Sequence, residues 1–284
     1  MTSAKPAGGA VRPLKILGIY AILIAGAVVI LGPFVLSVMT SLKTPQQLAT
    51  QSKLALPAPV TLENFQRLFS GELVDFSRSI AVTAGYVGIV LVGQLVFSIL
   101  AAYAFARVDF PGRDTIFWVY LATLMVPAVV TIVPLYLIIS EMGLRNTFWG
   151  LVLPYLFGSP YAIFLLREYF RGVPQELVDA ARIDGAGTWR ILTQIVVPLS
   201  RPIIATLGII TVVTHWNNFM WPLIITSGPE WSVITTSTAS VQTQFNGNWT
   251  IVMAATTIAL LPLIILFATF NKQIVTSIAI TSFR

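Results

Sequence analysis

The sequence predicts an all-α integral membrane protein with six transmembrane helices. Of its 284 residues, 56% are hydrophobic and 10% are charged, and the mean hydropathy is +0.84. Soluble domains carry about 25% charged residues. Six apolar segments are each about 20 residues long or longer, which is enough to cross a bilayer as a helix. These predicted spans cover residues 16–40, 80–106, 115–140, 148–166, 203–226 and 250–270.

Several prolines fall within these apolar segments. A proline removes a backbone N–H and interrupts a helix in water, but membrane helices tolerate it because neighbouring helices satisfy the freed carbonyl groups. We therefore expect kinks within these spans. The prolines concerned are Pro127, Pro134, Pro154, Pro160 and Pro262.

The basic residues predict the orientation of the spans, because cytoplasmic segments carry an excess of Lys and Arg. We expect residues 1–15 to form a cytoplasmic tail and residues 16–284 to form the transmembrane domain, with both termini in the cytoplasm. The external segments would then hold only Lys43, Lys53, Arg67, Arg78 and Arg145. The cytoplasmic segments would hold Lys5, Arg12, Lys15, Arg107, Arg113, Arg167, Arg171, Arg182, Arg190, Arg201, Lys272 and Arg284.

Composition also excludes several kinds of site. The chain has no Cys and one His, so neither a thiolate site nor a multi-His zinc site can form, and we expect no bound metal. The net charge of +6 is spread over short segments between apolar runs. This distribution indicates topology and contact with membrane lipid rather than nucleic-acid binding.

The sequence shows no motif by which the chain could power transport by itself. It has no G-x-x-x-x-G-K-[ST] phosphate loop, so we expect a non-enzymatic subunit. Ion-coupled carriers need ionisable groups at mid-membrane and usually contain paired repeats, and neither is visible here. The remaining explanation is that a partner protein drives transport.

A polar segment between the fourth and fifth spans, residues 174–198, predicts two short helices joined by a glycine bend. Pro174 suits the first position of a helix, and Glu176 places a favourable charge at its N-terminus. Gly185 and Gly187 are expected to end this helix, and Thr188 is expected to cap the second one. An amphipathic linker lying on the lipid surface would explain the same pattern.

The residues of this segment resemble the EAA signature of ABC importer permeases. The signature is present as Asp179-Ala180-Ala181, followed by Gly185, Ile195 and Val197-Pro198, with Asp179 where Glu is more usual. The flanking residues 173–177 and 183–186 are similar to the carbohydrate branch of maltose and glycerol-3-phosphate type. So is the sequence Trp216-Asn217-Asn218-Phe219-Met220-Trp221-Pro222-Leu223.

The resemblance implies a permease subunit of an ATP-driven importer in the bacterial cytoplasmic membrane, moving a sugar or related polyol by alternating access. It implies a second permease subunit, two cytoplasmic ATPase subunits that bind ATP and Mg, and an extracytoplasmic solute-binding protein or lipoprotein. The polar segment would be the coupling helix that docks on the ATPase. Its implied contact residues are Glu176, Asp179, Ala180, Ala181, Asp184 and Gly185.

Polar residues within the fifth span are candidates for the substrate pathway, because amides and indoles suit the hydroxyls and C–H faces of a sugar. Packing between helices explains the same residues equally well, and it is the favoured explanation for Gln94 and for His215 as a buried, neutral histidine. The candidates are Trp216, Asn217, Asn218 and Trp221.

The external segment 226–249 contains Trp231, Gln242 and Gln244, which by the same resemblance are candidate contacts for the binding protein. A solvated connector is the alternative. Two other functions remain as alternatives for the whole chain. One is an ABC permease for a non-sugar solute such as an amino acid or phosphate, and the other is an ion-coupled carrier.

Overall fold

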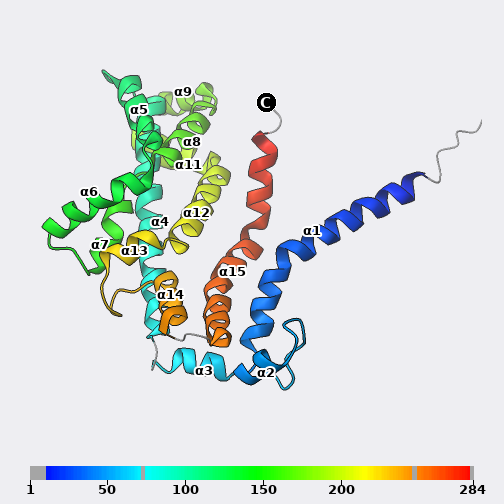
Figure 1. Ribbon diagram of the computed structural model, residues 1–284. Coiled ribbons are helices and arrows are strands. Elements are labelled where there is room, and N and C mark those ends of the chain that lie inside the picture. The colour runs from blue at the N-terminus through cyan, green and yellow to red at the C-terminus, as the bar shows by residue number, and fades with distance from the viewer. Residues whose placement is uncertain (1–10, 72–73, 245–247, 282–284) are drawn as a thin grey trace, which may run out of the picture. The chain divides into compact units, whose positions relative to one another are not determined.

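The computed structural model describes residues 11–71, 74–244 and 248–281, and within these ranges every regular element is a helix (Figure 1). The chain divides into two compact units, which we describe separately. Unit 1 comprises residues 1–73 and 241–258, and unit 2 comprises residues 74–240 and 259–284.

Unit 1 contains α1 (Val11–Ser41), α2 (Pro45–Thr50), α3 (Glu63–Phe69) and the beginning of α15 (Trp249–Thr281). The buried side chain of Asn64 joins these elements. Its Nδ2 donates to the carbonyl oxygens of Ser41 and Lys43, both at 2.8 Å, and its Oδ1 accepts from Thr250 Oγ1 at 2.8 Å. One amide thus connects the end of α1, the first turn of α3 and the first turn of α15.

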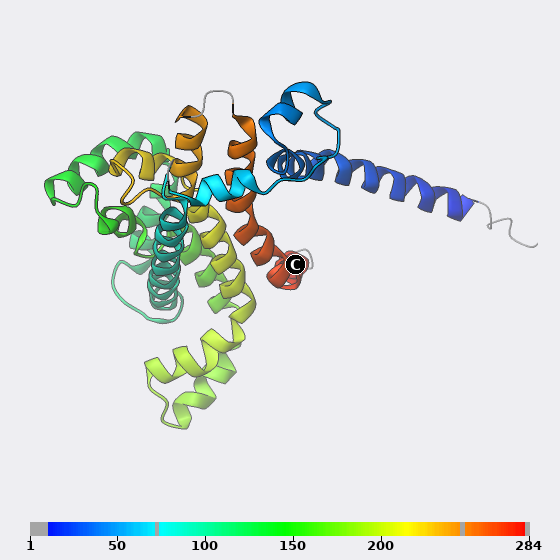
Figure 2. The ribbon, with the colours of Figure 1, turned by 90° about the horizontal axis from the view of Figure 1, so that it is seen from below.

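Unit 2 is built around α4, which runs from Phe76 to Arg107. Helices α8 (Pro160–Arg171) and α12 (Arg201–Trp216) pack along α4 (Figures 1 and 2). A β-carbon at Gly93 would collide with the side chain and carbonyl of Leu156, so glycine permits the close approach of α4 to that segment. The other helices of unit 2 are α5 (Arg113–Ala122), η1 (Thr123–Met125), α6 (Ala128–Glu141), α7 (Phe148–Val152), η2 (Leu153–Tyr155), α9 (Gln175–Ile183), α10 (Thr188–Ile191), the π-helical turn η3 (Leu192–Val196), α11 (Val197–Leu199) and α13 (Met220–Ile225), with most of α14 (Ile234–Gln244).

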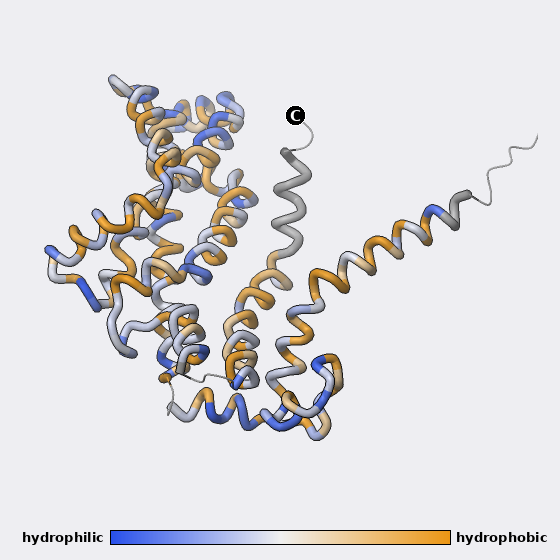
Figure 3. The backbone as a smooth tube through the Cα atoms, in the orientation of Figure 1, coloured by the Kyte–Doolittle hydropathy of each residue, from blue (hydrophilic) through white to orange (hydrophobic). Residues whose placement is uncertain are grey.

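Hydropathy follows the helices as the sequence predicts. Hydrophobic residues run along α1, while hydrophilic residues gather where α9 lies (Figure 3). The apolar side chains of α1 are largely exposed, for example Ile22 and Val29 at 75% each. Such exposure is costly in water and favourable in lipid, so α1 requires a bilayer or apolar protein around it.

In the described part of the chain, four helical segments are long and apolar enough to span a membrane, namely Lys15–Ser41, Phe76–Arg107, Phe148–Arg171 and Trp249–Phe270. Two further segments are pairs of helices bent at a break, by 102° between Met125 and Ala128 and by 78° between Leu199 and Arg201. If each bent pair is one span, the total is six. Helix α1 begins at Val11, within the predicted tail 1–15, and its candidate span begins at Lys15, whereas residues 1–10 lie outside the described part.

The predicted third span over 115–140 is bent by 102° at a break between two helices. The helix ends at Met125 and restarts at Ala128, because Pro127 disfavours helical geometry at the preceding residue, and Val126 has ψ 117°.

The predicted fifth span over 203–226 is also interrupted. Helix α12 ends at Trp216 and α13 begins at Met220. The ring of Pro222 would collide with the carbonyl of Asn218 if the helix continued. The chain avoids this by starting a new helix, and the freed Asn218 carbonyl accepts a hydrogen bond from Thr235 Oγ1 at 2.8 Å.

Candidate functional site

The polar segment between α8 and α12 folds as two short helices, as predicted, but its ends differ in detail. Helix α9 starts at Gln175, so Pro174 is its N-cap and not its first residue. Gly185 has φ +78° and ends α9 in the left-handed conformation that glycine adopts without strain. Gly187 is extended and is the N-cap of α10, so it does not end α9. Thr188 is therefore the first residue of α10 and not its cap.

One face of this α9–α10 segment (residues 174–191) is buried in the core of unit 2. Val178 is 1% exposed and packs in a cluster with Phe170, Ile191 and Leu192. Ala181 is half-buried against the same cluster. These contacts fix the orientation of α9 relative to α8 and α10.

The opposite face of the α9–α10 segment is exposed and contains large apolar side chains. Ile183 is 87% exposed, Trp189 67% and Leu177 46%. A separate hollow of about 220 Å³ is lined by residues that include Ala181, Asp184 and Arg190. Of the predicted coupling residues, Ala181 alone is half-buried, and those exposed are Glu176, Asp179, Ala180, Asp184 and Gly185.

Arg107, the last residue of α4, holds the base of α9. Its Nε and Nη2 donate to the carbonyl oxygen of Phe170 at 3.1 and 2.6 Å, and Nη2 also donates to the carbonyl of Val173. Its Nη1 donates to Gln175 Oε1, and the amide of Gln175 in turn donates to Asp179 Oδ1 at 2.9 Å. A single guanidinium therefore links α4 to the junction between α8 and α9.

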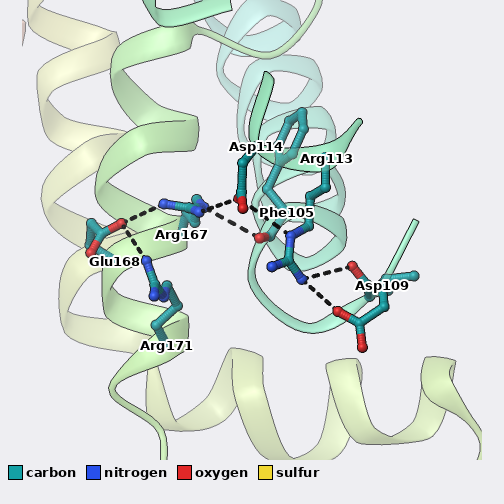
Figure 4. A network of polar contacts seen from close by, with 8 residues as sticks. Phe105, Asp109, Arg113, Asp114, Arg167, Glu168 and Arg171 are labelled. Carbon is teal, nitrogen blue, oxygen red and sulfur yellow. Dashed lines mark hydrogen bonds and ion pairs between the residues drawn. The ribbon is translucent and has the colours of Figure 1, made fainter. Parts of the chain in front are cut away.

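A second arginine joins α8 to α4 and α5, as Figure 4 shows. The side chain of Arg167 is 10% exposed and pairs with Asp114 at 3.1 Å and with Glu168 at 2.9 Å. Its Nε donates to the carbonyl oxygen of Phe105 at 3.3 Å, and its guanidinium carbon lies 4.0 Å from the ring centroid of Phe117. A buried charge with this many partners is satisfied in place.

From the sequence, Arg107 and Arg167 were interpreted only as topology signals, and these contacts were not predicted. Arg107 donates to a carbonyl of α8 that lies 63 positions further along the chain, so no pattern along α4 indicates this capping role.

A cluster of polar side chains lies between α4, η2 and α12. Tyr86 Oη and His215 Nδ1 are 3.0 Å apart, and Asn218 Nδ2 donates to Tyr86 Oη at 3.3 Å. The Tyr155 ring centroid lies 4.8 Å from that of His215. His215 is 5% exposed, so the structure places it as a buried, hydrogen-bonded residue, as favoured. The two tyrosines were not predicted.

Gln94 lies in the same region, and its side chain forms hydrogen bonds with two neighbouring elements. Its Nε2 donates to the carbonyl of Tyr155 at 3.4 Å, and its Oε1 accepts from Thr211 Oγ1 at 3.0 Å. These bonds join α4, η2 and α12, which agrees with the favoured role in helix packing.

Both candidate tryptophans of the substrate pathway are buried. Trp216 is 7% exposed and donates to the carbonyl of Ala259 at 3.0 Å, and Trp221 is 1% exposed and donates to the carbonyl of Gly150 at 3.1 Å. Pro154 has no N–H to offer the Gly150 carbonyl, so the indole replaces that missing donor.

The two candidate asparagines are more accessible. Asn217 is exposed, and its Nδ2 donates back to the carbonyl of Val213 at 2.8 Å. Asn218 is half-buried and bonded to Tyr86 and Thr235. Of the four predicted residues, Asn217 alone presents an exposed side chain.

The predicted external segment is partly helical, because α14 occupies Ile234–Gln244. Ser79 Oγ on α4 lies 2.6 Å from Ser237 Oγ, which ties α14 to α4. Trp231 is half-buried, with Arg78 Cζ 5.7 Å from its ring centroid. Gln242 is exposed, and the side chain of Gln244 lies outside the described residues.

Within the described residues, no group of three or more His, Cys, Asp or Glu side chains could hold a metal ion. Several apolar helices that are able to span a bilayer indicate a multi-pass membrane protein. The family of binding-protein-dependent transport system inner membrane components matches residues 94–279. The chain belongs to this family, and it is an inner-membrane permease of the ABC transporter class.

Individual relatives agree with this assignment. The chain is 34% identical over 265 residues to the sn-glycerol-3-phosphate transport system permease protein UgpE of Rhizobium meliloti, covering 88% of this chain and 91% of the relative. It is 31% identical over 227 residues to the arabinooligosaccharides transport system permease protein AraQ of Halalkalibacterium halodurans, covering 79% and 80%.

A solved structure has the same fold. One chain of a bacterial ABC transporter involved in the import of the acidic polysaccharide alginate superposes with a TM-score of 0.82 at 22% identity. The match covers 95% of this chain and 99% of that chain.

The substitution Arg107→Gln should loosen α9 without unfolding α4. The Phe170 and Val173 carbonyls would each lose a charge-assisted hydrogen bond, so amide hydrogen exchange across residues 174–183 should accelerate about tenfold. Hydrogen–deuterium exchange read by mass spectrometry would measure this. Arg182→Gln is the matched control, because Arg182 makes only an exposed ion pair with Asp179 at 3.5 Å in the contacts given for it. Equal acceleration in both variants would contradict the capping role.

Proposed function

We propose that the protein is a permease subunit of an ATP-driven importer for a sugar or a related polyol, including glycerophosphate-type solutes. The named transport systems of its relatives, for glycerol 3-phosphate and for arabinooligosaccharides, support this cargo class. In this proposal the bent pairs are spans, the chain crosses the membrane six times, and both termini are cytoplasmic.

The observation that carries the proposal is the exposed apolar face of the α9–α10 segment. Ile183 and Trp189 are more exposed than a soluble surface favours, while Val178 on the other face is fixed in the core. Large exposed aromatic and aliphatic side chains are typical interface anchors. We infer that this face docks on a cytoplasmic ATPase subunit, with Glu176, Asp184 and neighbouring residues around it.

The energy for transport comes from that partner in this proposal. Two ATPase subunits bind and hydrolyse ATP with Mg, and a second permease subunit completes the translocation pathway. Movement of α9 reaches α4 through Arg107, and movement of α8 reaches α4 and α5 through Arg167. Alternating access then follows from a shift of these packed helices around the pathway.

Other parts of the chain are proposed to contact the substrate and the binding protein. We propose Asn217 as a pathway residue, since its exposed amide can bind a hydroxyl group, whereas Asn218, Trp216 and Trp221 support its position. Trp231 and Gln242, with Gln244, are proposed contacts of the extracytoplasmic solute-binding protein. A related solved structure of an alginate ABC transporter in complex with a pentasaccharide-bound periplasmic protein supports such a partner.

The substitution Ile183→Lys should abolish coupling while leaving the fold intact. A cation at the C-terminal turn of α9 is compatible with the helix dipole, and the side chain is exposed. We expect ATP-driven uptake to fall about tenfold or more, with normal amounts of protein in the membrane. Val108→Lys is the control, because Val108 is also exposed at a helix C-terminus, that of α4. Wild-type uptake by the Ile183 variant would refute docking at this face.

Single-cysteine labelling tests the orientation, since the chain contains no cysteine. In intact spheroplasts, a membrane-impermeant maleimide should label Lys53→Cys and should fail to label Ala180→Cys. After permeabilisation both variants should react, because both positions are exposed. Labelling of Ala180→Cys from outside would reverse the proposed topology.

The variants Asn217→Ala and Trp221→Phe should fail in different ways. Asn217→Ala removes an exposed amide, so uptake should change its KM or maximal rate at unchanged protein levels. Trp221→Phe leaves the buried Gly150 carbonyl without its donor, which costs about 1–3 kcal/mol and should lower the amount of folded protein. Quantitative immunoblots beside uptake kinetics separate the two results. Normal kinetics in the Asn217 variant would remove it from the pathway.

A further inference from the structure

Unit 1 contains a largely apolar crevice that the transport proposal does not use. Its volume is about 510 Å³, within the usual range of small-molecule sites. Pro33, Leu36 and Thr40 of α1 line one wall, and Met253 of α15 lines the other. A volume of this size can hold part of a hydrocarbon chain beside the two helices.

The walls of the crevice are held in place by polar contacts on α1. Ser37 Oγ lies 3.4 Å from both the carbonyl oxygen of Met253 and Thr257 Oγ1. At the end of α1, Asn64 joins Ser41 to Thr250, at the beginning of α15. The crevice is therefore a fixed feature of unit 1.

The rim of the crevice combines a cation, an indole and exposed apolar side chains. Lys53 and Trp249 line it, and Trp249 is 49% exposed. Leu54 and Leu56, next to Lys53 in the chain, are 72% and 74% exposed. Lysine, tryptophan and exposed leucine at the end of a span are typical of the membrane interface. None of the described residues that line the crevice is acidic.

We propose that this crevice binds one anionic phospholipid, with an acyl chain between α1 and α15 and the headgroup phosphate at Lys53. Apolar contacts alone give little selectivity among lipids, because the acyl chain moves into the crevice from a bilayer that is equally apolar. The charge of Lys53 decides the preference, which we expect to be about fivefold for an anionic over a zwitterionic lipid. The outer-leaflet location of this lipid rests on the proposed topology.

The test uses the assembled transporter in vesicles of either dibrominated phosphatidylglycerol or dibrominated phosphatidylcholine, mixed with unbrominated lipid. Bromine quenches tryptophan fluorescence on contact, and the difference between wild type and Trp249→Phe isolates Trp249 from the other tryptophans. We expect its quenching to need about fivefold less brominated phosphatidylglycerol than brominated phosphatidylcholine.

The charge variants identify the headgroup contact. Lys53→Gln should abolish the preference and Lys53→Arg should keep it. Arg67→Gln is the matched control, because Arg67 is an exposed cation of α3 that does not line the crevice. Absence of Trp249-specific quenching would show that the partner permease covers the crevice, and an unchanged preference in Lys53→Gln would remove the headgroup site. Either result overturns the proposal. Because the vesicles carry the lipid in both leaflets, the outcome is independent of the orientation tested by cysteine labelling.

Discussion

The need to satisfy every backbone polar group inside the protein controls this structure. A bilayer offers no water to an unpaired carbonyl, yet the apolar helices contain prolines that create such carbonyls. The chain supplies side-chain donors from other helices. Trp221 bonds to Gly150, four residues before Pro154, and Thr235 bonds to Asn218, four residues before Pro222. Many polar residues within the spans are therefore committed to the backbone, which is why few remain free for a solute.

Where the helices leave the apolar region, charged side chains bond to the backbone carbonyls and join the helices. Arg107 occupies carbonyls at the junction of α8 and α9, and Arg167 joins α4, α5 and α8 through Asp114, the Phe105 carbonyl and the Phe117 ring. Each guanidinium has several donors in a fixed plane, so each can hold more than two elements in one geometry. The α9–α10 segment is consequently attached to α4 by stiff contacts as well as by the chain, a condition for passing on a displacement rather than absorbing it.

The sequence predicted the elements that depend on local composition and missed those that depend on distant partners. The apolar runs gave the positions of the spans, and Gly185 marked the end of α9 because its conformation is local. The breaks at Val126 and at residues 217–219 were not predicted, since the same prolines are compatible with a kink or with a full interruption depending on which donors lie nearby. The Tyr86–His215–Asn218 cluster joins residues more than 120 positions apart, so no pattern along one helix reveals it. For the candidate site, the exposed face of α9 could be predicted from its residues, but the arginine that fixes its base could not.

The residues on the two faces of the α9–α10 segment are constrained differently. Val178 is buried in the core of the protein, whereas Ile183 and Trp189 are exposed and contribute little to the stability of the fold. Substitutions on the outward face can therefore accumulate at little cost to folding, and the surface can evolve together with whatever protein it meets. If this face docks on an ATPase as proposed, a lineage could exchange one ATPase partner for another by altering a few side chains, while the membrane-embedded helices stayed the same.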